Sequence, residues 1–168
     1  MPDNYIPLLH EILDEVGKAK TKDMKVSVLR KHNSDALRMV IKASFDPVIV
    51  WDLPAGVPPY EKNEAPEGTE HTMLMSEARK LFHYIKGANN LTSHKREQMF
   101  VQLLEGLHQG EAEVLTLAKD KKLHQKYKGL SANVVKEAFN WDDDYKIDDS
   151  PKDSDTQTYW QTPGPANG

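Results

Sequence analysis

Apolar residues recur every three or four positions along the N-terminal part of the chain, which is the spacing of one face of an α-helix. The first run comprises Tyr5, Leu8, Leu9, Ile12, Leu13 and Val16, with Asn4 as the expected N-cap and Gly17 as the expected end. Thr21 should cap a short second helix and Ser34 a third. The third helix should stop at Asp46-Pro47, because a residue before proline is pushed out of the α region.

The same helical period returns in the second half of the chain. Leu74, Ala78, Leu81, Phe82 and Ile85 predict one helix that ends near Gly87. Thr92 or Ser93 should cap the next helix, another should begin near Gly110, and Ser131 should cap a last helix that runs to Trp141. The sequence therefore predicts an all-α fold, a compact bundle of six to eight helices within residues 4–141.

Residues 47–69 follow neither period. A short β-prone run, Val48 to Trp51, precedes a stretch rich in proline and glycine, and an extended segment at 48–51 is the only strand-like structure expected. We interpret residues 47–69 as an ordered or semi-ordered excursion from the domain of residues 1–141. Excursions of this length in a compact domain are usually functional or disordered.

Length and composition exclude several classes of protein. At 168 residues and 38% hydrophobic composition, the chain has the size of one domain with a tail. Without cysteine, disulfide, thiolate and iron–sulfur chemistry are excluded. No apolar run is long enough for a membrane span, and the acidic N-terminal stretch does not fit a secretory signal. Residues 142–168 hold seven Asp, two Lys and few apolar residues, which predicts a disordered, flexible acidic tail.

Charge is segregated along the chain. Residues 46–77 carry a net charge of −6 and residues 142–168 carry −5, which leaves +7 on the remainder. Two clusters supply most of the positive charge: Lys18, Lys20, Lys22, Lys25, Arg30 and Lys31, and Lys119, Lys121, Lys122, Lys126 and Lys128. A run of charges is commonly a solvated helix face, but two clusters in one chain also fit a surface that faces a polyanion.

Motifs for catalysis are missing from the sequence. It has no phosphate-binding loop, no nucleophile elbow and no His-Glu-x-x-His pair. Glu67, Glu70 and His71 could ligate a metal in principle, but they lack the usual ligand spacing. Asp142-Asp143-Asp144 lacks the glycine turn and final glutamate of a calcium loop. We therefore expect a non-enzyme without a metal or cofactor.

The order of helices and turns resembles the N-terminal DNA-binding domain of T-even phage-type ATP-dependent DNA ligases, over residues 8–141. The resemblance begins in Leu9-x-x-Ile12, the Thr21-Lys22 turn and the Val28-Leu29 pair. It continues through Pro54-x-Gly56 and is clearest from Leu91-Thr92 to Glu113-Val114-Leu115. It ends in a basic segment, Gly129-x-Ser131 and a helix that closes on Phe139.

That resemblance implies contacts with the phosphate backbone of duplex DNA and no reading of bases. The implied DNA-binding residues are Thr21, Lys22, Lys25, Lys119, Lys121, Lys122, Lys126, Lys128, Ser131 and Asn133. The adenylation motif of the ligases, Lys-x-Asp-Gly, does not occur here, so ligase chemistry is not implied. The proline-rich excursion and the acidic tail are additions to the ligase pattern.

The whole chain also resembles a family of short proteins from T-even-like phages of marine bacteria. This resemblance lies in the Trp51-x-Leu53-Pro54-x-Gly56-x-Pro58-Pro59-Tyr60 box and in the lysine-rich region around Gly129. It carries no function with it. It implies a phage protein located in the cytoplasm of the infected bacterial host. Together with the ligase resemblance, it leads us to expect a non-catalytic accessory protein that binds double-stranded DNA in replication, repair or packaging.

Two further interpretations stay open at this stage. Residues 1–141 carry a net charge of only +1, and dedicated DNA-binding domains are usually more basic. The chain could therefore be a protein–protein adaptor, with Trp51, Pro58, Pro59 and Tyr60 as its partner-binding residues, or a virion-associated protein. The same proline-rich box could instead fold back on its own core, since apolar loop residues often pack inward.

Overall fold

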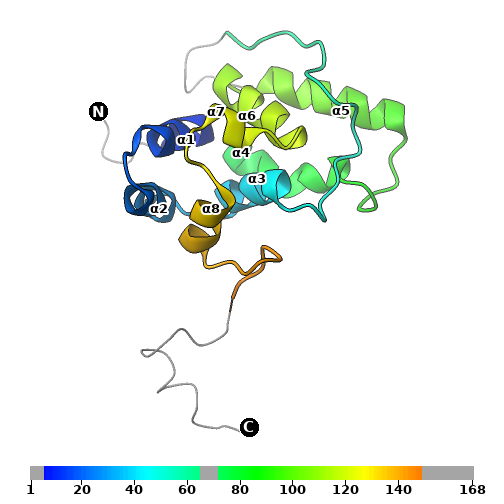
Figure 1. Ribbon diagram of the computed structural model, residues 1–168. Coiled ribbons are helices and arrows are strands. Elements are labelled where there is room, and N and C mark those ends of the chain that lie inside the picture. Colours follow the sequence, from blue (N-terminus) through cyan, green and yellow to red (C-terminus); the bar gives the residue numbers. More distant parts are fainter. Residues whose placement is uncertain (1–5, 65–71, 149–168) are drawn as a thin grey trace, which may run out of the picture.

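The protein is all-helical in a computed structural model that describes residues 6–64 and 72–148 (Figure 1). The helices of these ranges are α1 (Leu9–Lys18), α2 (Lys22–Lys31), α3 (Asp35–Phe45), α4 (Leu74–Glu77), the 3-10 helix η1 (Ala78–Tyr84), α5 (Ser93–Gly106), α6 (Gln109–Lys119), α7 (Leu123–Lys126) and α8 (Ala132–Phe139). The predicted all-α bundle is confirmed. Within the described ranges, strand pairing is limited to isolated bridges, Trp51 with Ile85 and Trp141 with Ile147.

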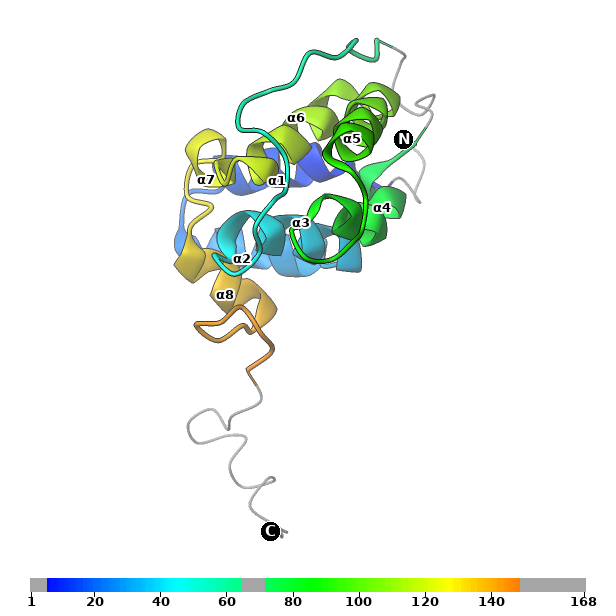
Figure 2. The ribbon, with the colours of Figure 1, turned by 90° about the vertical axis from the view of Figure 1, so that its right-hand side faces the viewer.

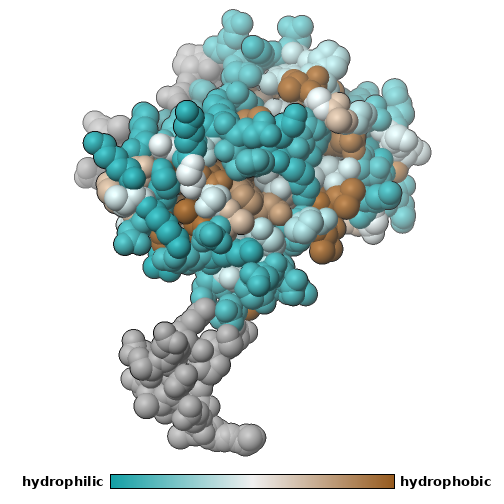
Figure 3. Space-filling view, in the orientation of Figure 1, coloured by the Kyte–Doolittle hydropathy of each residue, from teal (hydrophilic) through white to brown (hydrophobic). Residues whose placement is uncertain are grey.

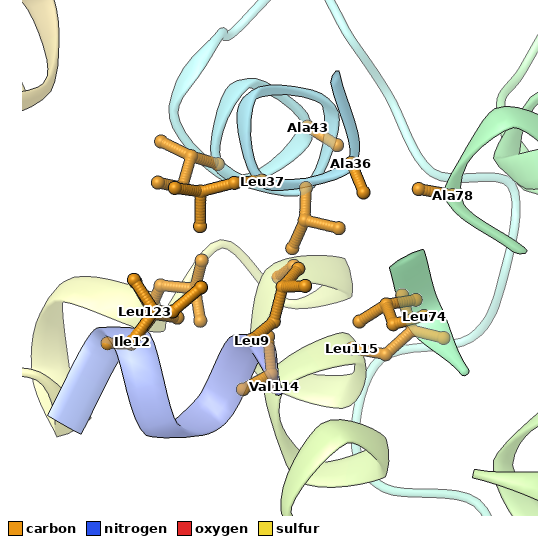
Figure 4. Packing of buried hydrophobic residues seen from close by; sticks show 14 of the residues in the cluster. Leu9, Ile12, Ala36, Leu37, Ala43, Leu74, Ala78, Val114, Leu115 and Leu123 are labelled. Atoms are coloured by element: carbon orange, nitrogen blue, oxygen red, sulfur yellow. The ribbon is translucent and has the colours of Figure 1, made fainter. Parts of the chain in front are cut away.

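Helices α3 and α6 form the centre of the bundle. α3 packs against α6, α4, η1 and α8, while α1 lies against α2 and α6. Leu37 of α3, Leu9 of α1 and Leu115 of α6 are fully buried and point into the space between these helices (Figure 4). α5 covers the other side of α6, and α8 packs against α2 below the bundle (Figures 1 and 2). One continuous apolar core results.

Side-chain caps fix the helix starts that the sequence predicts. The hydroxyl oxygens of Thr21, Ser34, Thr92 and Ser131 each accept a hydrogen bond from the backbone N–H three residues ahead, at 3.1–3.3 Å. Thr92, rather than Ser93, is thus the cap of α5. α3 ends at Phe45, directly before Asp46-Pro47, as expected. Local chemistry determines these boundaries.

The first and last helices are shorter than predicted. α1 begins at Leu9 rather than near Tyr5, because Leu8 has extended backbone and its N–H donates to the Glu11 carboxylate at 2.8 Å. The expected cap Asn4 lies outside the described residues. α8 ends at Phe139 instead of Trp141, because Asn140 adopts a left-handed conformation with φ 57°.

The predicted helix over residues 74–85 is broken. α4 is a single turn, η1 continues it as a 3-10 helix, and Ile85 is extended. Ile85 leaves the helix because it pairs with Trp51: the Lys86 N–H donates to the Val50 carbonyl at 2.8 Å and the Asp52 N–H to the Tyr84 carbonyl at 2.7 Å. The extended segment expected at 48–51 is therefore the partner that ends this helix.

Residues 142–148 belong to the folded domain, which corrects the boundary predicted after Trp141. The Asp142 N–H donates to the Lys146 carbonyl and the Asp148 N–H to the Asn140 carbonyl, each at 2.8 Å. This turn buries the Tyr145 ring edge-on against Trp141, with 6.1 Å between ring centroids. The remainder of the predicted acidic tail lies outside the described residues.

None of the helices in the described ranges has the length and apolar character that crossing a membrane requires.

Candidate nucleic-acid interface

Two basic segments that are far apart in the sequence meet at the ends of α1, α2 and α8. A Cβ placed on Gly17, at the end of α1, would lie 3.8 Å from the backbone nitrogen of Lys128. The Lys22 ammonium, at the start of α2, lies 2.9 Å from the Glu137 carboxylate of α8. We call the residues gathered here the lysine face: Lys18, Lys20, Lys22, Lys25 and Lys128.

Gly129 allows the two segments to approach closely. Its backbone is left-handed, with φ 81°, and a Cβ at this position would collide with the side chain of Lys25. The Lys25 ammonium in turn donates to the carbonyls of Val16 at 3.0 Å and Ala19 at 2.5 Å. Lys25 therefore caps the C-terminal end of α1 and neutralises its negative dipole end, in a half-buried position.

Two capped helix N-termini border the lysine face. Thr21 is the N-cap of α2 and Ser131 is the N-cap of α8, and both residues are exposed. Asn133, in the first turn of α8, lines the same surface cavity as Lys22. The amides of a first helical turn, together with the positive end of the helix dipole, favour an anion such as phosphate. The structure thus brings together six of the predicted DNA-binding residues: Thr21, Lys22, Lys25, Lys128, Ser131 and Asn133. Of these, Lys22 is already paired with Glu137, and the Lys25 ammonium is bound to the carbonyls of Val16 and Ala19, so Lys25 has a structural role like that of Lys119 and Lys121.

Lys119 and Lys121 do not face a phosphate, which corrects their predicted role. The Lys119 side chain is 2% exposed, and its ammonium lies 2.8 Å from the Pro54 carbonyl and 2.5 Å from the Asp120 carboxylate. The Lys121 ammonium donates to the carbonyls of Ala43, Asp46 and Ile49 at 2.9, 2.8 and 2.6 Å. Both lysines bind carbonyls inside the molecule. Those bound by Lys121 lie at and just after the end of α3, and the one bound by Lys119 lies in the non-helical segment that follows, so none of them has a helical partner.

Burial changes the acid–base behaviour of Lys121. Desolvation lowers the pKa of this lysine below its ordinary value, while the nearby Asp46 opposes the shift. Its backbone is left-handed as well, with φ 60°. The strained backbone and the three carbonyl contacts identify Lys121 as a structural residue that closes the end of α3.

Lys122, in the turn before α7, and Lys126, at the end of α7, are both exposed. The Lys126 ammonium lies 2.6 Å from the Glu113 carboxylate and 5.6 Å from the centre of the Tyr127 ring. The ion pair neutralises part of the charge that Lys126 would offer to DNA. Figure 3 shows mostly hydrophilic side chains over α1, α2 and α7 on this side of the molecule.

A family of unknown function, DUF6433, matches residues 12–125. The chain belongs to this family. No curated protein and no solved structure matches it. The part of this DUF6433 protein that matches the family begins inside α1 and ends inside α7. It therefore contains the α2 side of the lysine face, and Lys128 and α8 lie beyond it.

The proline-rich box of the DUF6433 protein folds back on the core, so Trp51 is not a surface residue as the adaptor interpretation requires. Trp51 is 8% exposed, its indole N–H donates to the Ala43 carbonyl at 2.9 Å, and its ring lies edge-on to Phe100. The half-buried Tyr60 donates its hydroxyl to the Gln109 side-chain oxygen at 3.3 Å. Of the four predicted partner-binding residues, Pro58 is half-buried and Pro59 is exposed.

Within the ranges 6–64 and 72–148, no cluster of three or more His, Cys, Asp or Glu is placed to hold a metal ion. Glu67, Glu70 and His71 lie outside these ranges. Asp142 instead builds the turn described above, because its carboxylate accepts the N–H of Asp144 at 2.8 Å and that of Lys146 at 3.1 Å.

Sequence reasoning missed two charged side chains, Glu111 and Arg30, that bind backbone groups at helix ends. The Glu111 carboxylate is buried and binds backbone amides of α1 and α4. The Arg30 guanidinium donates to the carbonyls of Glu137 at 2.9 Å and Ala138 at 3.2 Å, and so caps the end of α8. An acidic residue in the first turn of a helix was a visible signal for Glu111, whereas Arg30 gave none because its partners lie more than a hundred residues away in the sequence.

Proposed function

We propose that this DUF6433 protein is a non-catalytic protein that binds the backbone of double-stranded DNA without reading its sequence. The convergence of two distant basic segments on the lysine face supports the proposal. As the sequence resemblances imply, we further propose that it is a phage accessory protein in the cytoplasm of an infected bacterium.

The lysine face suits a phosphate backbone better than a single small anion. Lys18, Lys20 and Lys128 are exposed and come from two chain segments, so that their charges are spread rather than focused on one point. The starts of α2 and α8 add backbone amides beside them. Phosphate contacts of this kind position a protein on a duplex and carry no sequence information.

The test is a salt titration of binding to labelled duplex, nicked and single-stranded DNA. Each neutralised phosphate contributes about −0.9 to the slope of log K against log salt, so about four contacts give weak but strongly salt-dependent binding. The variant Lys18→Glu/Lys20→Glu/Lys128→Glu should lose binding to every duplex sequence alike. All three side chains are exposed, which keeps the fold intact.

The matched control is Lys62→Glu/Lys86→Glu/Lys95→Glu, which changes the net charge equally at three exposed lysines outside the lysine face. It should retain most of the binding. Equal losses in both triple variants would show that only the net charge matters. No binding of the wild-type chain to any duplex at low salt would overturn the proposed function.

The acidic C-terminal segment is expected to compete with DNA for the same lysines. A chain that ends at Asp148 lacks three Asp and one Lys. It should bind duplex DNA more tightly than the full chain at low salt, and the difference should shrink as salt screens the tethered charge. An unchanged affinity would contradict the competition between the acidic segment and DNA. It would not contradict the proposal that the lysine face binds DNA.

A further inference from the structure

A proline-rich strap crosses the side of the molecule formed by α5 and α6. The strap comprises residues 53–63, and Figures 1 and 2 show it within the chain that climbs from the end of α3 past α6. Its first part is fixed to the end of α6: the Lys119 ammonium binds the Pro54 carbonyl at 2.8 Å, and the Gly56 N–H donates to the Asp120 carboxylate at 3.2 Å.

The second part of the strap is fixed where α5 ends and α6 begins. The Tyr60 hydroxyl binds Gln109, and the Glu61 N–H donates to the Glu105 carboxylate at 2.9 Å. Between the two attachments lie Val57, Pro58 and Pro59. The prolines have no N–H to donate and a fixed φ, so this middle part forms a stiff span that is held from both sides.

A cavity of about 710 Å³ lies between the stiff span and α5. Phe100, which is 2% exposed, and Val101 contribute apolar surface from α5, and Val57 and Pro58 contribute it from the strap. Val57 is 67% exposed, although it lines the cavity. Figure 3 shows hydrophobic side chains at the surface along this side of the molecule. The volume is within the range of pockets that bind ligand groups in proteins.

The charged side chains of Glu97 and Lys119 line the cavity. Glu97 is exposed. The Lys119 ammonium is bound to Asp120 and the Pro54 carbonyl, so it offers no free positive charge. On α5, Arg96 lies 3.3 Å from the Asp52 carboxylate, His94 lines the cavity, and the exposed Lys95 does not line it. A partner that inserts apolar groups here therefore gains from a positive charge opposite Glu97.

We propose that the cavity under the strap is a docking site for an extended peptide of a partner protein, which inserts apolar side chains and places a basic residue opposite Glu97. This site is separate from the lysine face and does not depend on the DNA-binding proposal. The stiff span favours binding, because an opening that is already formed requires little ordering when the peptide enters.

The probes are two short fluorescein-labelled peptides of leucine, serine and either lysine or glutamate, otherwise identical in sequence. Binding to the full chain is followed by fluorescence anisotropy. The lysine peptide should bind at least about tenfold more tightly than the glutamate peptide. Glu97→Lys should reverse this preference, because it changes the sign of the charge at the cavity without altering its apolar surface.

A second variant, Val101→Trp, should fill the cavity and weaken binding of the lysine peptide about tenfold or more. Val48→Trp is the matched control, since Val48 is 84% exposed and does not line the cavity. Thermal unfolding verifies that each variant is folded, and the Glu97→Lys result decides the question if Val101→Trp does not fold.

Three results would overturn the docking site: no binding of either peptide up to about 1 mM, equal binding of both peptides, or an unchanged preference in Glu97→Lys. Equal effects of the two tryptophan variants would also place the binding elsewhere. Duplex DNA binding, measured on the same variants, distinguishes a failure of this site from a failure of the proposed function, because the lysine face is unaltered in all of them.

Discussion

Glu111 shows how one buried carboxylate can join three helices. It lies in the first turn of α6 and is 1% exposed. Its two carboxylate oxygens accept the N–H of Leu9 at 2.9 Å and the N–H of Leu74 at 2.8 Å. These are the first residues of α1 and α4, whose amides have no partner within their own helices. The negative charge also faces the positive ends of both helix dipoles.

We expect Glu111→Ala to lower the free energy of unfolding by on the order of 3 kcal/mol, because it leaves two buried N–H groups without an acceptor. Glu111→Gln should cost less, since its oxygen still accepts one of the two bonds. Urea denaturation measures both. Glu113→Ala is the control, because Glu113 makes an exposed ion pair with Lys126. Equal losses at the two positions would contradict the joining role.

Tyr84 should make the fold sensitive to alkaline pH. Burial, followed by the charge of Glu77, raises the pKa of the Tyr84 hydroxyl from 10.0 to about 12. The folded chain thus holds this proton more tightly than the unfolded chain does. The resulting stability is fully present below pH 10.0 and is lost as the pH rises toward about 12.

The Tyr84→Phe variant has no hydroxyl to titrate, so its free energy of unfolding should fall less than that of the wild type between pH 10.0 and about 12. Urea denaturation at several pH values in this range measures the difference. Burial also raises the pKa of Tyr127, which is still present in the variant. The variant should therefore still lose some stability at alkaline pH through Tyr127. Wild-type and Tyr84→Phe curves that fall in parallel above pH 10.0 would contradict the assignment.

At the scale of elements, the turn between α7 and α8 depends on a glycine for two separate reasons. Gly129 has φ 81°, and its missing Cβ leaves room for the Lys25 side chain that caps α1. Gly56 has φ 91° with open space around it. The two glycines therefore share a backbone requirement, and only Gly129 adds a packing requirement.

We expect Gly129→Ala to destabilise the protein by on the order of 2 kcal/mol, against about 1 kcal/mol for Gly56→Ala. The excess comes from the displacement of Lys25 from the carbonyls of Val16 and Ala19. In a chain that already carries Lys25→Ala, Gly129→Ala should cost only about as much as Gly56→Ala. A double-mutant cycle of unfolding free energies measures this difference. Equal costs in both backgrounds would show that backbone strain alone is responsible.

At the scale of the whole molecule, the folded domain closes with the turn after α8. Tyr145 is 7% exposed, and the Lys136 ammonium lies 5.0 Å from the centre of its ring. Trp141, also nearly buried, packs against both Phe139 and Tyr145. A short aromatic cluster thus continues the core beyond the last helix.

Truncation should show this contribution. We expect a chain that ends at Trp141 to be less stable than one that ends at Asp148, by about 2 kcal/mol, since it loses the buried Tyr145 ring. Thermal and urea unfolding of the two chains measure the difference, and Tyr145→Ala in the longer chain should reproduce most of it. Equal stabilities would support the boundary that composition alone suggests.

Local sequence features predict most of the helical segments and most of the helix starts. Apolar residues at helical spacing predict α1, α2, α3, α5, α6 and α8, but they do not predict α7, and they predict α4 and η1 as one α-helix. A cap such as Thr21 or Ser34 acts on an N–H only three residues away. The stop of α3 before Pro47 is equally local. Such features depend on neighbours in the chain, so they can be predicted before any tertiary contact is known.

The roles of the individual lysines depend on tertiary contacts, which the sequence does not show. Lys121 binds carbonyls 72–78 residues away and Lys119 one that is 65 residues away, whereas Lys18 and Lys20 stay exposed beside Lys128. The sequence shows these residues as equal positive charges. Which of them closes a helix end and which faces solvent depends on where packing brings backbone carbonyls that lack a helical partner.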